Sequence, residues 1–479
     1  MRATISESGS VAKQFVAAGL VLLVLDGKLS LDDDISKWVP EVSGLKRKFT
    51  TRHLLSHTSG LPDRYLLHDL QGRPAGIVDH PNSEVLEIVS RLRDLNFEPG
   101  EDYLYSNTGY VVAVAVLERV SGQSLQQFTH SRIFAPLAMT DSRWREDHRT
   151  VVPRRATAYT GNPSTGIRHD HPFTRVIGSG GLLTTVDDFL KWSNALQRGD
   201  SVWRQVRDSL ESVIRLNEGT AITYGLGVTS TEWRGVRRVS HTGSTGGYRA
   251  ALYRFPQQQV SVALLCNTAA ANPGDLATAV ANVVLDGDLI PLPAEVAAKA
   301  TLTPEELAAF AGPYWSPRTN RFLSIVSRDG QLVDSVSRTA FVPQGADHFR
   351  ARSSQVELTF LGSGTTRSVR RESPGERSVE YVRVELPDIN ATTATAYAGT
   401  YSSRELDVDL QFTARGDSVF VQRGSEKPVY LRPLYRDGFA VAGSGIVRFT
   451  RDEQAAVSAL EIWDDRVRRL RFDRVHGSK

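Results

Sequence analysis

The chain has 479 residues, of which 40% are hydrophobic and 23% charged, which is ordinary for a globular protein with a buried core. Its 57 basic and 54 acidic residues nearly balance, so there is no electrostatic case for a nucleic-acid partner. A single cysteine, Cys266, excludes an internal disulfide. The longest apolar run, residues 15–25, is too short to span a bilayer, and no small-x-small cleavage pattern follows it. We therefore expect neither a transmembrane segment nor a targeting peptide.

The first part of the chain is rich in helix patterns. Five segments have the periodicity or the end residues of helices: 10–27, 51–56, 83–95, 107–121 and 185–196. Gly27 and Gly122 stand where the first and the fourth of them would end. Ser106 or Asn107 is placed to cap the fourth.

From about residue 222 the pattern changes to strands. Three are expected, over residues 224–228, 247–255 and 260–267. A helix over 276–285 follows, with Asp275 placed to cap it. Residues 1–290 are thus expected to form one domain of helices around a sheet, with a helical insertion at about 51–180.

A proline-containing stretch, Ile290-Pro291-Leu292-Pro293, predicts a linker over about 291–300. Beyond it, apolar and polar residues alternate over 406–412, as in a half-buried strand. Asp329-Gly330 indicates a hairpin turn.

This C-terminal part also repeats itself. Ala311-Gly312-Pro313-Tyr314 is matched by Ala398-Gly399-Thr400-Tyr401, an offset of 401 − 314 = 87 residues. Asp347-His348-Phe349 is matched in the same way by Asp437-Gly438-Phe439. So long a period predicts two small β domains, over 301–388 and 389–479, each burying its own core.

The first motif that could carry chemistry is Ser10-Val11-Ala12-Lys13, at the start of the predicted buried helix. A spacing of three residues puts the hydroxyl and the amine on one helical face, and a serine nucleophile needs an adjacent base. At a helix N-terminus the Ser10 N–H is also free to bind an oxyanion. Alone, however, this motif is better explained by a capping serine and a surface lysine.

Two further motifs follow. In Tyr105-Ser106-Asn107 the phenol can relay a proton, and the amide can contact both a lysine and a substrate carbonyl. In His241-Thr242-Gly243-Ser244 small residues at a strand edge leave room for an acyl substrate, and the Ser244 N–H is a candidate second oxyanion donor. Alone, a core tyrosine before a helix cap explains the first, and a glycine-rich turn explains the second.

The three motifs occur together, about 95 and 135 residues apart. In this combination the chain resembles the serine β-lactamase and penicillin-binding-protein superfamily. It is most similar to the branch with Tyr-x-Asn, which includes class C β-lactamases, D-aminopeptidases, D,D-carboxypeptidases and esterases. The resemblance covers about residues 9–290 and extends to the stretches 10–34, 54–62, 178–182 and 224–227. His57 lies in a turn that is structural in the family, and we interpret it so here.

The resemblance implies an α/β (α+β) domain with an antiparallel sheet flanked by helices, followed by β domains similar to lipocalin-like barrels. It implies that Ser10 attacks a carbonyl to form an acyl-enzyme, while Lys13 and Tyr105 share the proton transfers. The N–H groups of Ser10 and Ser244 would hold the oxyanion.

The same resemblance implies that Asn107 orients a substrate amide and that His241, Thr242 and Gly243 belong to the substrate-binding strand. It implies no metal and no organic cofactor. The partner would be a small-molecule or short-peptide acyl substrate.

Two features depart from the family pattern. His241 stands where true β-lactamases carry lysine, and histidine offers a positive charge only when protonated. This shifts the expected substrate from β-lactams towards those of the D-aminopeptidase and esterase branches. In addition, Ser10 lies only nine residues after Met1, whereas family members carry a helix and two or more strands before the nucleophile. We therefore expect an N-terminally truncated domain whose sheet exposes an edge.

The sequence favours an active acyl hydrolase acting on a small amide, an ester or a D-amino-acid peptide. The alternative is a catalytically inactive, truncated family member with a binding role only. The presence of all four polar groups, at residues 10, 13, 105 and 107, favours the enzyme. A Ser-His-Asp hydrolase of the α/β type is disfavoured, because the sequence contains no Gly-x-Ser-x-Gly motif.

Overall fold

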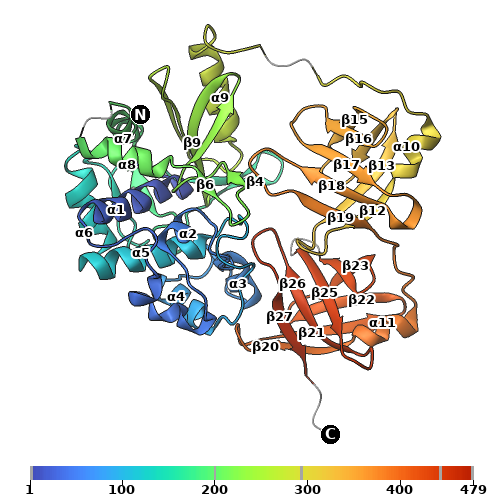
Figure 1. The fold of residues 1–479 in the computed structure, drawn as a ribbon. Coiled ribbons are helices and arrows are strands. Elements are labelled where there is room, and N and C mark those ends of the chain that lie inside the picture. The colour runs from blue at the N-terminus through green and yellow to red at the C-terminus, as the bar shows by residue number, and fades with distance from the viewer. Residues whose placement is uncertain (1–3, 199–200, 292–294, 442–444, 476–479) are drawn as a thin grey trace. The chain divides into compact units, whose positions relative to one another are not determined.

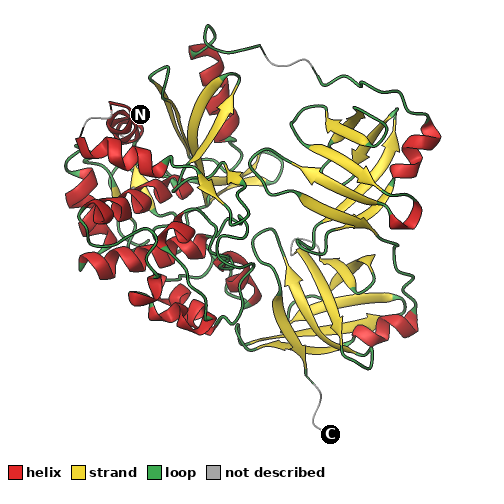
Figure 2. Ribbon diagram, in the orientation of Figure 1, coloured by secondary structure: helices red, strands yellow, loops and turns green. Residues whose placement is uncertain are grey.

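A computed structural model describes residues 4–198, 201–291, 295–441 and 445–475. The chain divides into two compact units, Met1–Pro291 and Leu292–Lys479. The first combines helices with sheets, and the second contains two β-barrels (Figure 1, Figure 2). Of the predicted linker, residues 292–294 lie outside the described ranges. No helix in the described part of the chain is both long and apolar enough to cross a membrane.

The main sheet of the first unit is antiparallel, with the strand order β11-β10-β9-β8. Its strands are β8 (Thr229–Trp233), β9 (Val236–Thr245), β10 (Tyr248–Phe255) and β11 (Val260–Cys266). The strands predicted over 247–255 and 260–267 are confirmed. The strand predicted over 224–228 is wrong, because Gly227 has a left-handed φ of 78° that interrupts an extended chain. The glycine instead lets the loop approach α1, where a Cβ at 227 would lie 3.1 Å from the Lys13 carbonyl carbon.

The central strand, β10, is buried on both faces. Ala251, Tyr253 and Phe255 pack in one cluster with residues of α9 (Pro273–Val284). The alternate residues Leu252 and Arg254 face the other side. There they line a small cavity with residues of α1 (Lys13–Leu25), α7 (Val186–Arg198) and α8 (Ser201–Leu210). The sheet therefore lies between α9 on one face and the group that contains α1 on the other (Figure 1).

The other helices are α2 (Thr51–Leu55), α3 (Arg64–Leu70), α4 (Asn82–Arg91), α5 (Asn107–Ser121) and α6 (Leu125–Thr129). All five helices predicted before residue 200 are present, as α1, α2, α4, α5 and α7. Ser106 caps α5 and Gly122 ends it with a φ of 69°, as expected. The helix predicted over 276–285 is α9, although its cap is Asn272 and not Asp275. The helices α3, α6 and α8 were not predicted.

The helix predicted over 10–27 starts differently from the prediction. Residues Gly9–Ala12 form a 3-10 turn, η1, and the α-helix begins only at Lys13. Eleven of the 13 residues of α1 are buried, which fits a helix that is apolar all round. Phe15 stacks against Trp192 with ring centroids 4.8 Å apart.

The segment before η1 is held by a separate small sheet. β1 (Ser6–Glu7) pairs with β5 (Leu182–Thr184), which pairs in turn with β2 (Arg143–Trp144). The Glu7 carboxylate is fully buried and accepts two hydrogen bonds of 3.1 Å from the Arg145 guanidinium. This bidentate ion pair fixes the chain three residues before Ser10. Two short hairpins complete the unit, β3 (Tyr159–Asn162) with β4 (Gly166–His169) and β6 (Ile214–Arg215) with β7 (Ala221–Ile222).

The second unit consists of two closed eight-stranded antiparallel barrels. The two β domains predicted from the repeat are confirmed, and so is the barrel class that the resemblance implied, whereas the number of strands in each was not predicted. The first follows the helix α10 (Pro304–Phe310) and contains β12 (Gly312–Trp315), β13 (Phe322–Arg328), β14 (Gln331–Asp334), β15 (Ala340–Pro343), β16 (His348–Ala351), β17 (Glu357–Leu361), β18 (Ser368–Glu372) and β19 (Val379–Arg383). The second follows α11 (Ala391–Tyr397) and contains β20 (Gly399–Ser403), β21 (Val408–Arg415), β22 (Ser418–Arg423), β23 (Val429–Tyr435), β24 (Gly438–Val441), β25 (Gly445–Arg451), β26 (Val457–Trp463) and β27 (Leu470–Arg474).

The repeated Ala-Gly-x-Tyr motif is the joint between each short helix and its barrel. The Tyr314 hydroxyl donates to the carbonyl of Phe310 at 2.8 Å, and Tyr401 donates to that of Tyr397 at 3.1 Å. Each tyrosine is fully buried and anchors the helix end to the first strand. The predicted turn Asp329-Gly330 joins β13 to β14.

Candidate active site

The site is built around the buried amine of Lys13, whose side chain is inaccessible to solvent. Its Nζ lies 3.1 Å from Ser10 Oγ, 2.9 Å from Asn107 Oδ1 and 2.6 Å from the carbonyl oxygen of Ser179. The ring centroid of Tyr105 lies 4.8 Å from the same nitrogen. Three of the residues predicted from the sequence, Ser10, Tyr105 and Asn107, therefore lie around the amine of the fourth, Lys13.

Close backbone packing places Ser10 against β9. A Cβ at Gly243 would lie 1.9 Å from the Ser8 carbonyl oxygen and 2.9 Å from the Ser10 nitrogen. A Cβ at Gly9 would lie 2.5 Å from the Ser244 nitrogen. Only glycine fits at these two positions, so the backbone around Ser10 and the backbone around Ser244 lie in direct contact.

The hairpin geometry sets the direction of the Ser244 N–H. Thr245 and Tyr248 flank a two-residue turn and form its closing hydrogen-bonded pair, so the next pair, Ser244 and Arg249, does not exchange hydrogen bonds. The Ser244 N–H therefore points away from β10. On that side β8 pairs with β9 only as far as Ser240, which leaves the N–H open to the site.

The residues of the third motif, 241–244, alternate between the two faces of β9. His241 and Gly243 are buried on the side of η1, whereas Thr242 and Ser244 are exposed on the opposite face. The structure thus brings His241 beside the Lys13 cluster and leaves Thr242 at the accessible face of the strand.

His241 is neutral at neutral pH. Burial, together with the nearby charge of Lys13, lowers its pKa from 6.5 to about 4. Its Nδ1 lies 2.6 Å from the carbonyl oxygen of Thr242, which can only accept, so Nδ1 carries the hydrogen. Its Nε2 then accepts from the Tyr224 hydroxyl at 2.9 Å. Burial raises the pKa of Tyr224 well above its usual value, so this phenol remains a donor.

Two contacts of the site were not predicted. Asp63 Oδ2 accepts from both the backbone N–H and the Nδ2 of Asn107, at 2.7 and 2.8 Å, and so turns the amide oxygen towards Lys13. The position of Asp63 as the cap of α3 was the available clue. Ser179 acts through its backbone carbonyl, which no side-chain pattern reveals.

His57 lies behind the site and not in it. Its ring is buried 4.1 Å from the ring centroid of Tyr105 and 4.7 Å from that of Tyr224. Its Nδ1 accepts from the backbone N–H of Ser106 at 3.1 Å. These contacts hold Tyr105 and the following residue in place, which agrees with our interpretation of His57 as a structural residue.

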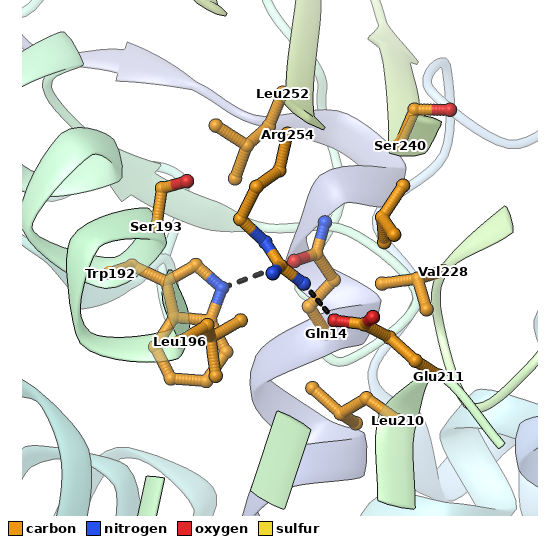
Figure 3. Close-up of a pocket in the computed structure, with 11 residues that line it drawn as sticks. Gln14, Trp192, Ser193, Leu196, Leu210, Glu211, Val228, Ser240, Leu252 and Arg254 are labelled. Carbon is orange, nitrogen blue, oxygen red and sulfur yellow. Dashed lines mark hydrogen bonds and ion pairs between the residues drawn. The ribbon is translucent and has the colours of Figure 1, made fainter. Parts of the chain in front are cut away.

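Figure 3 shows a small cavity that Gln14 lines from α1. The Trp192 indole donates to Gln14 Oε1 at 3.1 Å, and Arg254 pairs with Glu211 across the cavity. Burial lowers the pKa of Arg254 to about 10. None of the predicted site residues lines this cavity, so it is not the acyl site. Among the described residues, the side chains grouped closely enough to hold a metal ion are His68, His80 and Glu84, which are likewise not part of the acyl site.

Comparison with known proteins places this geometry in context. Residues 2–285 match the family model described as Beta-lactamase. Penicillin-binding protein 4* of Bacillus subtilis (strain 168) is 30% identical over 284 residues, which cover 54% of this chain and 60% of that protein. This chain therefore spans less than two thirds of that relative. A D-aminopeptidase of Brucella melitensis is 25% identical over 415 residues, 86% of this chain and 75% of the relative.

Solved structures agree in fold. The octameric penicillin-binding protein homologue from Pyrococcus abyssi superposes with a TM-score of 0.52 at 23% identity, over 79% of this chain and 88% of that one. The D-amino acid amidase from Ochrobactrum anthropi SV3, complexed with D-phenylalanine, has a TM-score of 0.50 at 25% identity, over 59% of this chain and 85% of that one.

The first prediction concerns the contact between η1 and β9. We expect Gly243→Ala to lower the free energy of unfolding by about 1–3 kcal/mol, because the added methyl group would overlap the Ser8 carbonyl. Gly287→Ala is the control, since a Cβ there meets nothing within 4 Å, and should change it by less than about 0.5 kcal/mol. Urea unfolding followed by tryptophan fluorescence measures both. Equal stability of Gly243→Ala and the wild type would contradict the close approach.

The second prediction concerns the buried neutral His241. Between pH 6.5 and about pH 4 the unfolded chain binds a proton at this residue that the folded chain does not. The free energy of unfolding should therefore fall as the pH falls through this window, by up to about 3 kcal/mol from this residue. His241→Gln should remove that part of the slope. Urea unfolding of both proteins at several pH values between 7 and 4 tests this, and identical slopes would rule it out.

Proposed function

Because this chain belongs to the β-lactamase family of serine hydrolases, we propose that it hydrolyses a small amide, an ester or a D-amino-acid peptide through an acyl intermediate on Ser10. The observation that carries the proposal is the Lys13 amine, fully buried and 3.1 Å from Ser10 Oγ. A serine hydroxyl needs such a base within hydrogen-bond reach to become a nucleophile.

In the proposed acylation, Lys13 first releases one proton to solvent, and its amine then takes the proton of Ser10 as Oγ bonds to the carbonyl carbon. The carbonyl electron pair moves to oxygen, where the N–H groups of Ser10 and Ser244 stabilise the charge. Collapse of this intermediate re-forms the carbonyl and breaks the bond to the leaving group, which receives the proton. Tyr105, whose ring lies 4.8 Å from Nζ, shares this transfer. Water then attacks the ester by the same route, and the acid leaves.

Asn107 is proposed to orient the substrate. Its Oδ1 contacts Lys13, and one of its two Nδ2 hydrogens goes to Asp63. A primary amide has a second N–H donor, which we assign to the carbonyl of the substrate amide. Asp63 would then act as a positioning residue, because it fixes the amide without contacting the substrate.

The neutrality of His241 narrows the proposed substrate class. With a pKa of about 4, this side chain brings no positive charge to the site at neutral pH. A substrate carboxylate, such as that of a β-lactam or of a peptide C-terminus, would gain no ion pair there. This favours esters, and amides of amino acids, over β-lactams. Relatives named D-aminopeptidase and D-amino acid amidase support D-amino-acid amides as the first compounds to test.

The third prediction tests the proposed nucleophile and base. Ser10→Ala and Lys13→Met should each lower hydrolysis of p-nitrophenyl esters or D-alanyl p-nitroanilide by at least about 1,000-fold. Tyr105→Phe should lower it by about 100-fold, as expected for loss of one proton relay. Labelling by a fluorescent phosphonate should vanish in Ser10→Ala and persist in the control Ser425→Ala, which changes an exposed serine of the second barrel.

The outcomes of this experiment separate the two candidate functions. A wild-type protein that folds but neither turns over nor labels would support the catalytically inactive binding protein. Turnover that survives in Ser10→Ala would instead reject Ser10 as the nucleophile and show that another residue carries out the hydrolysis.

The fourth prediction tests the role of charge at residue 241. His241→Lys introduces an amine that can pair with a substrate carboxylate, so the ratio of kcat/KM for nitrocefin to that for a neutral ester should rise about tenfold. His241→Gln, which stays neutral, should leave the ratio near its wild-type value. Circular dichroism verifies the fold of both variants. An unchanged ratio in a folded His241→Lys would exclude charge at this position as a determinant of substrate choice.

A further inference from the structure

A second polar cluster lies on α3 and α4, and no step of the proposed hydrolysis uses it. His68 belongs to α3, His80 lies two residues before α4, and Glu84 lies in the first turn of α4. One potential ligand atom from each of the three lies within 4.8 Å of the others. Both histidine side chains are fully buried, and that of Glu84 is 15% exposed.

The hydrogen bonds of His80 orient one nitrogen towards the cluster. Its Nε2 lies 2.8 Å from the carbonyl oxygen of Arg73, which can only accept, so Nε2 carries a hydrogen. Its Nδ1 lies 3.0 Å from Glu84 Oε2. A backbone carbonyl that fixes one ring nitrogen while the other faces a ligand is the usual outer contact of a metal-binding histidine.

His68 supplies an independent observation. Both of its ring nitrogens are buried, and neither has a hydrogen-bond partner. A buried polar group without a partner is unfavourable and rare. A neutral imidazole has one ring nitrogen without a hydrogen, so one unpaired lone pair is present in this cluster.

We propose that His68, His80 and Glu84 bind one divalent transition-metal ion, for which zinc is the best match. Two imidazole nitrogens and one carboxylate oxygen are ligands that zinc accepts in a tetrahedral site, with a water as the fourth. The proton shared between His80 Nδ1 and Glu84 Oε2 leaves to solvent when the ion binds.

Metal binding requires one of the two histidine rings to change its orientation. The His68 and His80 rings are stacked, with centroids 3.9 Å apart and planes inclined by 12°. Because an imidazole lone pair lies in the ring plane, one ring has to turn for both to reach the same ion. Turning the His68 ring would break no hydrogen bond, because neither of its nitrogens has a partner.

Some charges near the cluster oppose a bound cation and others favour it. Arg64, four residues before His68 on α3, carries a positive charge that opposes a cation. The Glu84 carboxylate compensates for it. Arg73 contacts Oε1 of Glu84 and also donates to Oε2 at 3.5 Å, so the ion would take Oε2 from this longer contact while Oε1 stays paired with Arg73.

The fifth prediction tests this site on the full chain after removal of bound metal with EDTA. Competition with a chromophoric chelator should show one equivalent of Zn²⁺ bound with a Kd below about 1 μM, as three-ligand sites commonly reach. His68→Leu and Glu84→Gln should each weaken binding at least tenfold. His68→Leu should fold, because the ring makes no hydrogen bond that leucine would lose.

A matched control is His348→Leu. His348 pairs with Glu357 at 3.2 Å in the first barrel but belongs to no three-ligand cluster of the described residues. Its variant should bind zinc like the wild type. Co²⁺ loading gives a second readout, because the visible absorption of the histidine-bound ion should disappear in His68→Leu.

The remaining outcomes are decisive. A wild-type chain that binds no zinc at micromolar concentration would overturn the proposal. Binding that persists in His68→Leu but is lost in Glu84→Gln would also overturn it, because only a His–Glu pair would then be involved. Should His68→Leu fail to fold, unweakened binding by Glu84→Gln would still reject the site.

Discussion

The burial of one amine constrains the first unit more than any other interaction. An amine removed from water costs free energy unless its donors find acceptors. Those of Lys13 find three, from η1, from α5 and from the loop at 178–181. The loop reaches the amine because Gly178 and Gly181 take left-handed φ values of 98° and 83°, which side chains disfavour. Three segments far apart in the chain therefore meet at one nitrogen, and the place where they meet is the proposed acyl site.

The approach of η1 to β9 completes this constraint on the other side. Because Gly9 and Gly243 carry no side chains, η1 and β9 touch through their backbones. Glu7 and its buried ion pair with Arg145 hold the preceding strand in place. The two proposed oxyanion donors are thus set by packing between backbones and not by a side chain that could rotate. Such preorganisation is what electrostatic stabilisation of an oxyanion requires.

The sequence predicts elements with strong local patterns and misses those shaped by tertiary contacts. α5 was foreseen because a cap, an apolar run and a stop glycine all agree, and the barrels because their motifs repeat. Only the end of β9, at residues 241–244, was recognised as a strand edge. Beyond Ser240, where the pairing with β8 ends, its residues are mostly polar and show no apolar alternation. The apolar stretch from Tyr224 has the composition of a strand, but Gly227 instead lets this loop pack closely against α1. His68 was overlooked because neither its burial nor its lack of partners is visible in a linear pattern.

One physical rule connects Lys13 with His68. Leaving a buried polar group unpaired costs about 1–3 kcal/mol. Lys13 meets this rule, because all donors of its amine find acceptors within the chain. Its two shortest contacts, to the carbonyl of Ser179 and to Asn107 Oδ1, hold it 3.1 Å from Ser10 Oγ, where it can exchange a proton. His68 does not meet it, although it lies against His80 and close to Glu84. A group whose partners are complete is suited to move a proton between them. The His68 imidazole has no such partner and lies beside two further possible ligands, His80 and Glu84. A bound metal ion would pair with both its unpaired nitrogen and the nearby carboxylate.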